Sequence, residues 1–252
     1  MIRRAAEISW READRLDRQH TLCILPVSSL EQHGHHLPLG TDDLILDGAL
    51  GALEGVWGEE DGELLIFPSL KYGNSVEHTG FCGTISLRVD TLQRVIRDVA
   101  ASLADSGFRH LLLLNSHGGN TAILQGISQE LYRDLGIRIW NVDLWASRFF
   151  SFAEPLIEAP LSGECHGGEI ETSLLMHWTP ELVADPGGLT PEELNCTADF
   201  GAGNKGWLTR EISETGIIGD ARASRAETGE KLAAGMGEQL GRILREIYGG
   251  IR

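Results

Sequence analysis

A run of four leucines, Leu111–Leu114, constrains the fold of this chain more than any other segment. A strand without polar side chains on either face must be covered on both faces, as in the parallel sheets of α/β proteins. Other apolar segments alternate with segments of helical periodicity, which is the pattern of an α/β layer fold with a mostly parallel sheet. The predicted strands are 22–27, 64–67, 84–87, 110–114 and 137–142.

The spacing of apolar residues also predicts helices. They are expected at 91–106, at 121–135 and at about 225–248. Asp90 is expected to cap the first of them and Gly107 to end it. Before the last, Ser224 and Glu227 have the spacing of a capping box.

Neither a Gly/Ser-rich linker nor an internal repeat divides the chain, so we predict a single domain over residues 1–252. Residues 183–220 are less regular and rich in glycine and polar residues. We expect them to form a long excursion, either near a functional site or at a subunit contact.

The chain is acidic, with 37 Asp and Glu against 21 Lys and Arg and a formal net charge of −16. This charge would repel nucleic acids and anionic membranes, so neither is expected as a partner. No apolar run approaches the ~20 residues that span a bilayer, and Arg3 comes too early for a signal peptide. Four widely spaced cysteines indicate reduced thiols. We therefore expect a soluble, cytoplasmic protein that acts on a small molecule.

Acidic and imidazole side chains follow the apolar segment 22–27 directly. Glu31 and His33 are two residues apart, so in extended backbone both can face the same point. Asp42 comes nine residues after His33 and adds a second carboxylate. Oxygen and nitrogen donors together suit a borderline divalent cation such as zinc or manganese. This pattern predicts a metalloenzyme.

A second polar group, Asn115 to Asn120, stands where the leucine-rich strand ends and the next helix begins. His117 has the position of a metal ligand at the carboxyl end of a strand, although a histidine can also simply cap a turn. Gly118 and Gly119 would let the backbone approach a ligand closely, and Asn120 opens the helix.

Two further segments carry chemistry. Histidine side chains ordinarily titrate near neutrality, so His166 is a natural candidate for a proton shuttle beside a metal-activated water. Glu169 and Glu171 after it fit the first turn of a buried helix, where acidic residues are favourable for structural reasons alone. The segment Tyr72–Thr84 has the composition of a loop, either over the site or on the plain surface. Within it, the candidates for contacts with substrate or with metal ligands are Ser75, Glu77 and His78.

Three elements together resemble the creatininase (creatinine amidohydrolase) family from about Ile24 to Glu227. They are Glu-Gln-His-Gly-x-His-Leu-Pro followed by Thr-Asp, the loop His-Gly-Gly-Asn, and His-x-Gly-x-x-Glu-Thr-Ser. The resemblance implies a single three-layer α/β/α domain with a mostly parallel central sheet, a binuclear metal site and commonly a hexameric assembly.

Carried over to this sequence, the resemblance implies roles for individual residues. Glu31 and His117 would hold one metal, His33 would hold the other, and Asp42 would bridge them. The family's catalytic histidine matches His166. The remaining matches are His36, assigned to a supporting position, and Glu171, which follows His166 at the family's interval.

One departure from creatininases concerns the second metal. Creatininases carry His-Tyr-Glu where this chain has His117-Gly118-Gly119, and that glutamate is a ligand. We therefore predict that Glu171 completes the site here, with Glu169 as the next choice. The change also removes part of the creatinine pocket. Branches with the Gly-Gly-Asn loop resemble this chain more closely, and include a formamide deformylase, a mycofactocin-maturation peptidase and a hydrolase of a cyclic inositol-derived ketone.

The sequence thus predicts hydrolysis of a C–N bond in a small amide or cyclic amide by a water that bridges two divalent ions. Zinc is the first choice of metal, and manganese and iron are the alternatives. His166 would carry the proton, and Trp140, Trp145 and Trp207 are candidates for an aromatic wall. The alternatives are hydrolysis of a cyclic ketone or carbohydrate-like substrate, peptide cleavage in cofactor maturation, and a non-catalytic metal-binding scaffold. From the family resemblance we also expect the protein to form a homo-oligomer.

Overall fold

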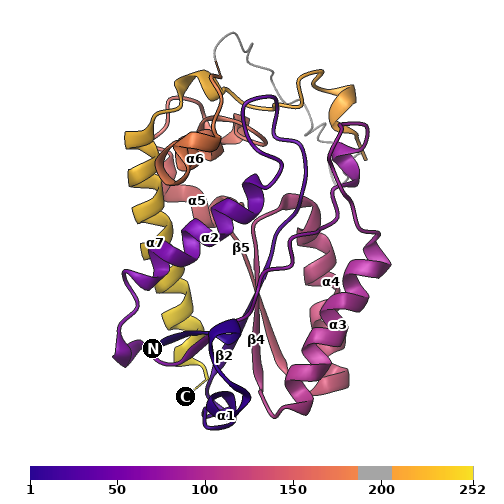
Figure 1. The fold of residues 1–252 in the computed structure, drawn as a ribbon, viewed down its shortest axis with the longest axis vertical. Helices are drawn as coiled ribbons and strands as arrows, with labels where there is room; N and C mark the ends of the chain where they lie inside the picture. The colour runs from indigo at the N-terminus through magenta and orange to yellow at the C-terminus, as the bar shows by residue number, and fades with distance from the viewer. Residues whose placement is uncertain (187–205, 252) are drawn as a thin grey trace.

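The computed structural model describes residues 1–186 and 206–251. One sheet of five parallel strands runs through the middle of the described chain, in the order β1-β3-β2-β4-β5 (Figure 1). The strands are β1 (Ile2–Arg4), β2 (Leu22–Val27), β3 (Leu64–Ile66), β4 (His110–Asn115) and β5 (Arg138–Asp143).

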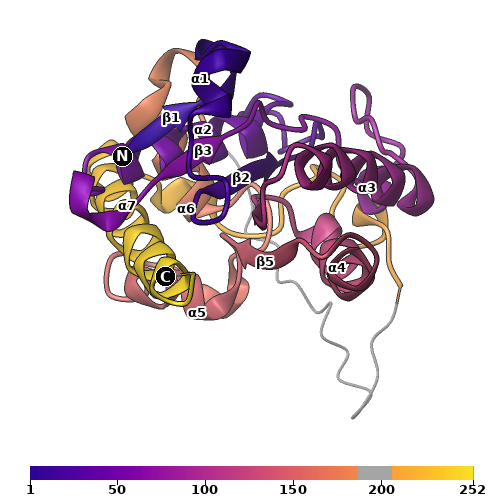
Figure 2. The same ribbon diagram turned by 90° about the horizontal axis from the view of Figure 1, so that it is seen from below.

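Helices cover both faces of the sheet, which gives three layers (Figure 2). On one face lie α2 (Thr41–Glu54), α5 (Ser147–Phe150), α6 (Glu169–Trp178) and α7 (Ala226–Gly249). The other layer holds α3 (Val89–Asp105) and α4 (Thr121–Leu135), with the short α1 (Trp10–Asp14) near its edge. The predicted fold class, α/β with a mostly parallel sheet between helices, is confirmed.

The leucines of β4 explain why the sheet has this position. Leu112 and Leu114 belong to the core under α2 and α7, whereas Leu111 and Leu113 belong to the core under α3 and α4. Successive side chains of a strand point to opposite faces, so an all-leucine strand supplies both cores. All four side chains are fully buried.

Two predictions about strands were wrong. Residues 84–87 form no strand, because Ile85 makes only an isolated antiparallel bridge to Leu30. The sequence analysis also missed β1, an edge strand of Ile2, Arg3 and Arg4 that lacks an apolar run.

Helix ends differ from the prediction in two places. The helix α3 begins at Val89, so Asp90 lies inside its first turn and Arg88 occupies the capping position. At α7 the cap is Arg225, without a side-chain bond, and the predicted capping box is absent. Instead, the Ser224 hydroxyl donates to the Glu169 carbonyl, because α7 is held against α6.

The excursion predicted at 183–220 falls partly outside the described residues. Of its described part, Ile218 pairs with His166 in an antiparallel bridge, so this part does lie near the site. The described parts of the chain contain no helix that is long and apolar enough to cross a membrane. The prediction of a single domain stays a prediction.

Candidate metal centre

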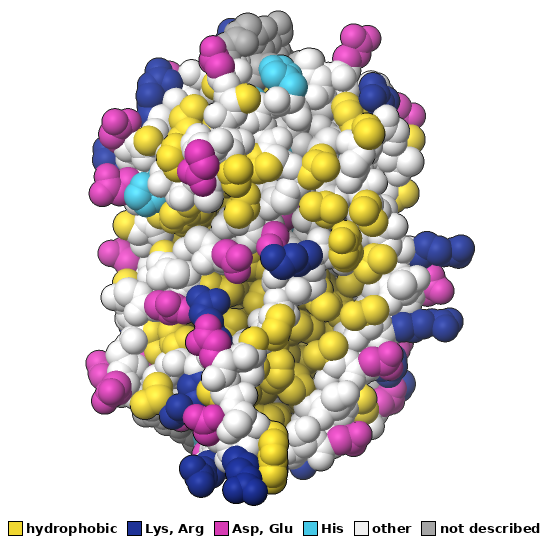
Figure 3. Space-filling view, in the orientation of Figure 1, with side chains coloured by type: hydrophobic (Ala, Val, Ile, Leu, Met, Phe, Trp, Pro, Cys, Tyr) yellow, Lys and Arg dark blue, Asp and Glu magenta, His cyan; other side chains and the backbone are white. Residues whose placement is uncertain are grey.

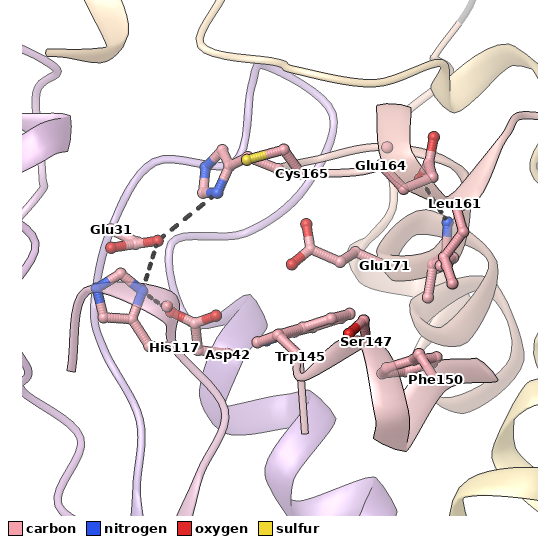
Figure 4. A pocket seen from close by; sticks show the side chains of 14 residues that line it. Glu31, Asp42, His117, Trp145, Ser147, Phe150, Leu161, Glu164, Cys165 and Glu171 are labelled. Atoms are coloured by element: carbon pink, nitrogen blue, oxygen red, sulfur yellow. Dashed lines mark hydrogen bonds and ion pairs between the residues drawn. The ribbon is translucent and has the colours of Figure 1, made fainter. Parts of the chain in front are cut away.

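Three stretches far apart in the sequence bring buried acids and imidazoles to the carboxyl end of the sheet. Glu31 and His33 follow β2, and His117 follows β4. Asp42 and Glu171 lie in the first turns of α2 and α6. All five residues are buried. Figure 4 shows Glu31, His117, Asp42 and Glu171 around one cavity.

The ligand atoms form two groups that share Asp42. Glu31, Asp42 and His117 offer atoms within 4.8 Å of one another, and so do His33, Asp42 and Glu171. The two oxygens of Asp42 face different imidazoles: Oδ1 lies 3.6 Å from His33 Nε2, and Oδ2 lies 3.6 Å from His117 Nδ1. A carboxylate placed between two donor sets suits two neighbouring cations.

Backbone carbonyls decide which nitrogen each histidine presents. His117 Nε2 donates to the Asn74 carbonyl at 2.8 Å, so its Nδ1 lone pair faces the centre. His33 Nδ1 faces the Glu31 carbonyl at 3.2 Å, so its Nε2 faces the centre. Such contacts typically orient metal-ligating histidines.

The donor set passes a second test for cations. Among the described residues, six buried side-chain atoms have no hydrogen-bond partner, and three of them belong to this centre: Glu31 Oε2, His33 Nε2 and Asp42 Oδ2. Buried polar atoms are rarely left without a partner, because their desolvation costs ~1–3 kcal/mol each. The residues therefore fit a pair of divalent ions.

In the metal-free protein, protonated imidazoles balance the negative charge of the buried carboxylates. Burial favours the neutral imidazole, but Glu171 and Asp42 outweigh it and raise the pKa of His33 to about 9. Likewise, Glu31 and Asp42 overcome burial and raise the pKa of His117 to about 10. Burial, with Asp42 nearby, raises the pKa of Glu171 to about 7. Both imidazoles are thus cationic at neutral pH in the metal-free protein. Their positive charges balance the carboxylates, and bound metal ions could replace them in this role.

His166 presents a neutral imidazole to the same centre. Its Nε2 donates to the Gln32 carbonyl at 2.6 Å, so the Nδ1 lone pair is directed inward, 3.7 Å from Glu31 Oε1. The ring centroid lies 4.1 Å from those of both His33 and His78. Burial and the charge of His33 hold the pKa of His166 well below its usual value. Such a nitrogen can accept a proton at the centre.

A model of the family described as "Creatininase: Creatinine amidohydrolase" matches residues 6–244. The chain belongs to the creatininase family. The members of this family are metal-dependent hydrolases, and so is this protein.

Two relatives show how far the similarity extends. The chain is 31% identical to the mycofactocin precursor peptide peptidase of Mycolicibacterium smegmatis over 224 residues, which is 85% of this chain and 81% of the relative. It is 33% identical to the creatinine amidohydrolase of Pseudomonas putida over 194 residues, 70% of this chain and 72% of that protein.

Solved creatininase structures have the same fold. One named "Creatininase Mn" superposes with a TM-score of 0.78 at 25% identity, covering 97% of this chain and 98% of that one. A mutant creatininase of "Zn-Zn type" gives a TM-score of 0.76 at 26% identity, with the same coverage.

The Gly-Gly-Asn loop of this creatininase-family chain holds the candidate ligand His117 in place. The Asn120 side chain accepts from the Asn74 amide at 2.9 Å and donates to the Ser28 carbonyl at 3.1 Å. A Cβ on Gly119 would overlap the Asn74 carbonyl that receives the His117 N–H, and would lie 2.5 Å from Glu77 Oε1. At Gly118, by contrast, a Cβ would meet nothing within 4 Å.

The other residues predicted to make contacts surround the candidate ligands. Ser75 bonds to the Ser29 hydroxyl and lies 3.4 Å from His117 Nε2, as does Glu77 Oε1. His36 Nε2 bonds to the Thr172 hydroxyl at 2.8 Å, next to Glu171, and burial lowers the pKa of His36 to about 4. These contacts could not be predicted from the spacing of residues along the chain, because the partners lie on other elements.

Glu169, the second choice for completing the site, points away from the centre. Its carboxylate accepts the backbone N–H groups of Glu158 and Ala159 at 2.9–3.0 Å, and it belongs to neither donor group of the centre. The alternative that Glu169 completes the second metal site is therefore not supported by the geometry. The Glu171 carboxylate does face that site, with Oε1 3.9 Å from His33 Nε2.

A cavity of about 280 Å³ opens beside the centre. Trp145 forms part of its wall, stacked on Phe150 with the ring centroids 5.0 Å apart, and its indole N–H donates to the Ser116 carbonyl. Trp140 packs against the core instead. Phe150 and Glu164 also line this wall and were not predicted from the sequence. The position of Trp145 just after β5 was the available signal, because sites in α/β folds lie at the carboxyl ends of strands.

Proposed function

We propose that this creatininase-family protein is a binuclear metal-dependent hydrolase that cleaves a C–N bond of a small amide or cyclic amide. One observation carries the proposal: the two oxygens of Asp42 face two different buried imidazoles, each within its own donor group. A carboxylate placed in this way can contact a cation on each side.

In this proposal Glu31, Asp42 and His117 hold one divalent ion, and His33, Asp42 and Glu171 hold the other. Two such ions supply Lewis acidity for a substrate carbonyl and make water nucleophilic near neutral pH. Zinc is our first choice because the donors are imidazole and carboxylate, and manganese or iron would also suit them. The related structures with manganese or zinc agree with this range.

We assign the movement of the proton to His166. Its Nδ1 is the basic atom because Nε2 is committed to the Gln32 carbonyl. The imidazole would take a proton at Nδ1 on the cavity side and deliver it to the leaving nitrogen, which becomes an amine. Stacking between two other imidazoles keeps the ring in one orientation during this transfer.

The cavity supports a small substrate with an apolar part. Its wall combines Trp145, Phe150, Leu161 and Ile170 with the carboxylates of the centre. Gly119 leaves no side chain where creatininases carry a glutamate, so creatinine itself is not our first choice. Cleavage of a peptide bond is the second candidate, favoured by the 31% identity to a peptide peptidase. Both candidates are hydrolyses of a C–N bond.

We further propose that the protein is a homo-oligomer, with a hexamer as the family resemblance suggests. Figure 3 shows apolar side chains gathered over the loop that precedes α3. The exposed members of this loop surface are Tyr72, Val76, Ile85 and Val89, which are 46–55% exposed. Adjacent apolar side chains on a surface mark interaction sites.

The proposed function is tested by turnover of the purified, zinc-loaded protein with a panel of substrates. Formamides, short peptides, creatinine and cyclic ketones would be compared before and after removal of metal with a chelator. We expect metal-dependent hydrolysis of at least one amide or peptide. Turnover of cyclic ketones alone, or metal-loaded protein that is silent on the whole panel, would contradict the proposal.

A further inference from the structure

Glu31 stands among more imidazoles than its role as a ligand requires. Besides His117, its Oε1 lies 3.4 Å from His78 Nε2. Besides the two groups that share Asp42, the ligand atoms of Glu31, Glu77 and His78 also lie within 4.8 Å of one another, as do those of Glu31, His33 and His166, so Glu77 and His78 could take part in a third cation site. Whether His78 presents a lone pair or a proton to Glu31 decides between a third cation and a different role.

The side chain of Gln32 fixes that choice. Its Oε1 accepts the Gly34 N–H at 2.9 Å, and its Nε2 donates to the Gly216 carbonyl at 3.0 Å, so the amide has one orientation. The same Nε2 lies 2.8 Å from His78 Nδ1. An amide nitrogen only donates, so His78 Nδ1 must be the acceptor.

Thr209 makes a second contact with the same nitrogen, its Oγ1 lying 3.0 Å from His78 Nδ1. With the lone pair of Nδ1 engaged, the proton of the neutral ring sits on Nε2 and faces Glu31 Oε1. An N–H directed at a carboxylate attracts it, whereas it cannot coordinate a cation. All three residues, Gln32, His78 and Thr209, are buried.

We propose that His78 is a positioning residue for the metal centre: its Nε2–H holds the Glu31 carboxylate in place, and Gln32 and Thr209 select the tautomer that does so. The inference rests on the proposed function, because it takes Glu31 as a metal ligand. It also gives the described segment after residue 205 a role, since Thr209 and Gly216 reach the centre through these bonds.

The test is zinc titration of the full chain by calorimetry with a competing chelator, together with the visible spectrum of the Co²⁺-loaded protein. We expect two equivalents of zinc in the wild type. His78→Phe keeps the bulk but removes the N–H, and should weaken one equivalent about 10–100-fold, as is typical for lost partners of ligands. His78→Gln offers an N–H near the same place and should restore most of that affinity.

A second pair of variants changes Thr209, which is not a proposed ligand. These variants test the proposal even if His78→Phe does not fold. Thr209→Val removes the hydroxyl at nearly constant volume, whereas Thr209→Ser keeps it. We expect Thr209→Val, but not Thr209→Ser, to shift the Co²⁺ spectrum and weaken the same equivalent of zinc.

The outcomes separate the two proposals. If the wild type binds no zinc, the proposed function and this inference both fail. If it binds two equivalents and neither His78→Phe nor Thr209→Val changes affinity or spectrum, only the inference fails. A third equivalent that the His78 variants lose would make His78 a ligand and would also overturn it.

Discussion

Asp42 is the residue on which the two donor groups depend. It is 2% exposed, and each of its oxygens faces one of the groups. We expect Asp42→Ala to lower the metal content from two ions per chain to one or none, measured by elemental analysis of the dialysed protein. Asp47→Ala, an exposed acid on the same helix, is the control and should keep both ions. Two tightly bound ions in Asp42→Ala would refute the bridging role.

Protons should leave the centre when metal enters. The pKa of about 9 for His33 and of about 10 for His117 means that both imidazoles are doubly protonated, and therefore cationic, at pH 7.5 in the metal-free protein. Metal ligands must lose these protons, so zinc binding should release about two protons per chain, counted by calorimetry in buffers of different ionisation enthalpy.

The sign of the pH dependence follows from the same shifts. Because protons compete with zinc below these raised pKa values, zinc affinity should rise with pH until about pH 9–10 and then level off. Affinity that is constant between pH 7 and pH 9 would show that His33 and His117 are not protonated in the free protein.

His166 should affect the rate rather than the metals. Losing a general acid or base typically costs about 10²–10⁴ in rate, so His166→Ala should lower kcat by that factor while metal content stays the same. The measurement is steady-state kinetics with metal-loaded protein, on a substrate found in the panel. His35→Ala, a change at an exposed neighbour of the first motif, should leave kcat unaltered. Full turnover by His166→Ala would remove His166 from the mechanism.

At the scale of elements, the ends of strands and the first turns of helices together supply the side chains of the centre. The strands β2 and β4 bring His33 and His117 to one end of the sheet, while the first turns of α2 and α6 supply Asp42 and Glu171. The strands β2 to β5 could be predicted from apolar runs, whereas β1 has no such run. The start of α2 was not predicted, because Thr41 and Asp42 belong to the polar motif after β2.

The loop after β4 offers a matched pair of substitutions. Gly119→Ala would drive a methyl group into the Asn74 carbonyl and the Glu77 carboxylate, whereas Gly118→Ala would meet open space. Overpacking of this kind costs about 1–3 kcal/mol. We expect Gly119→Ala to lower the free energy of unfolding by that amount and to weaken zinc binding, as measured by denaturant titration and calorimetry. Equal behaviour of the two variants would show that the backbone relaxes at no cost.

At the scale of the whole molecule, we predict that subunits associate through the exposed loop surface before α3. Val89 is the first residue of α3 and is 49% exposed, so Val89→Asp adds charge to this surface without harming the helix start. We expect it to reduce the mass measured by light scattering after gel filtration. Trp10→Asp, at the first position of α1 and 73% exposed, should keep the wild-type mass. A monomeric wild type would contradict the proposal.

The amino-acid sequence by itself determined where β2, β3, β4 and β5 lie along the chain, the apolar faces of α3, α4 and α7, and the segments in which acids and imidazoles gather. These features depend on local periodicity and on residue type, both of which are visible along the chain. Only the tertiary structure decided which of two acids, Glu169 or Glu171, faces the centre.

Two residues along a helix turn a side chain by roughly 200° about its axis. One carboxylate therefore meets His33 and the other meets the backbone of residues 158–159. Which nitrogen of His78, His117 and His166 faces the centre was likewise settled by partners from other elements, because a carbonyl or an amide imposes its role on the ring nitrogen it contacts.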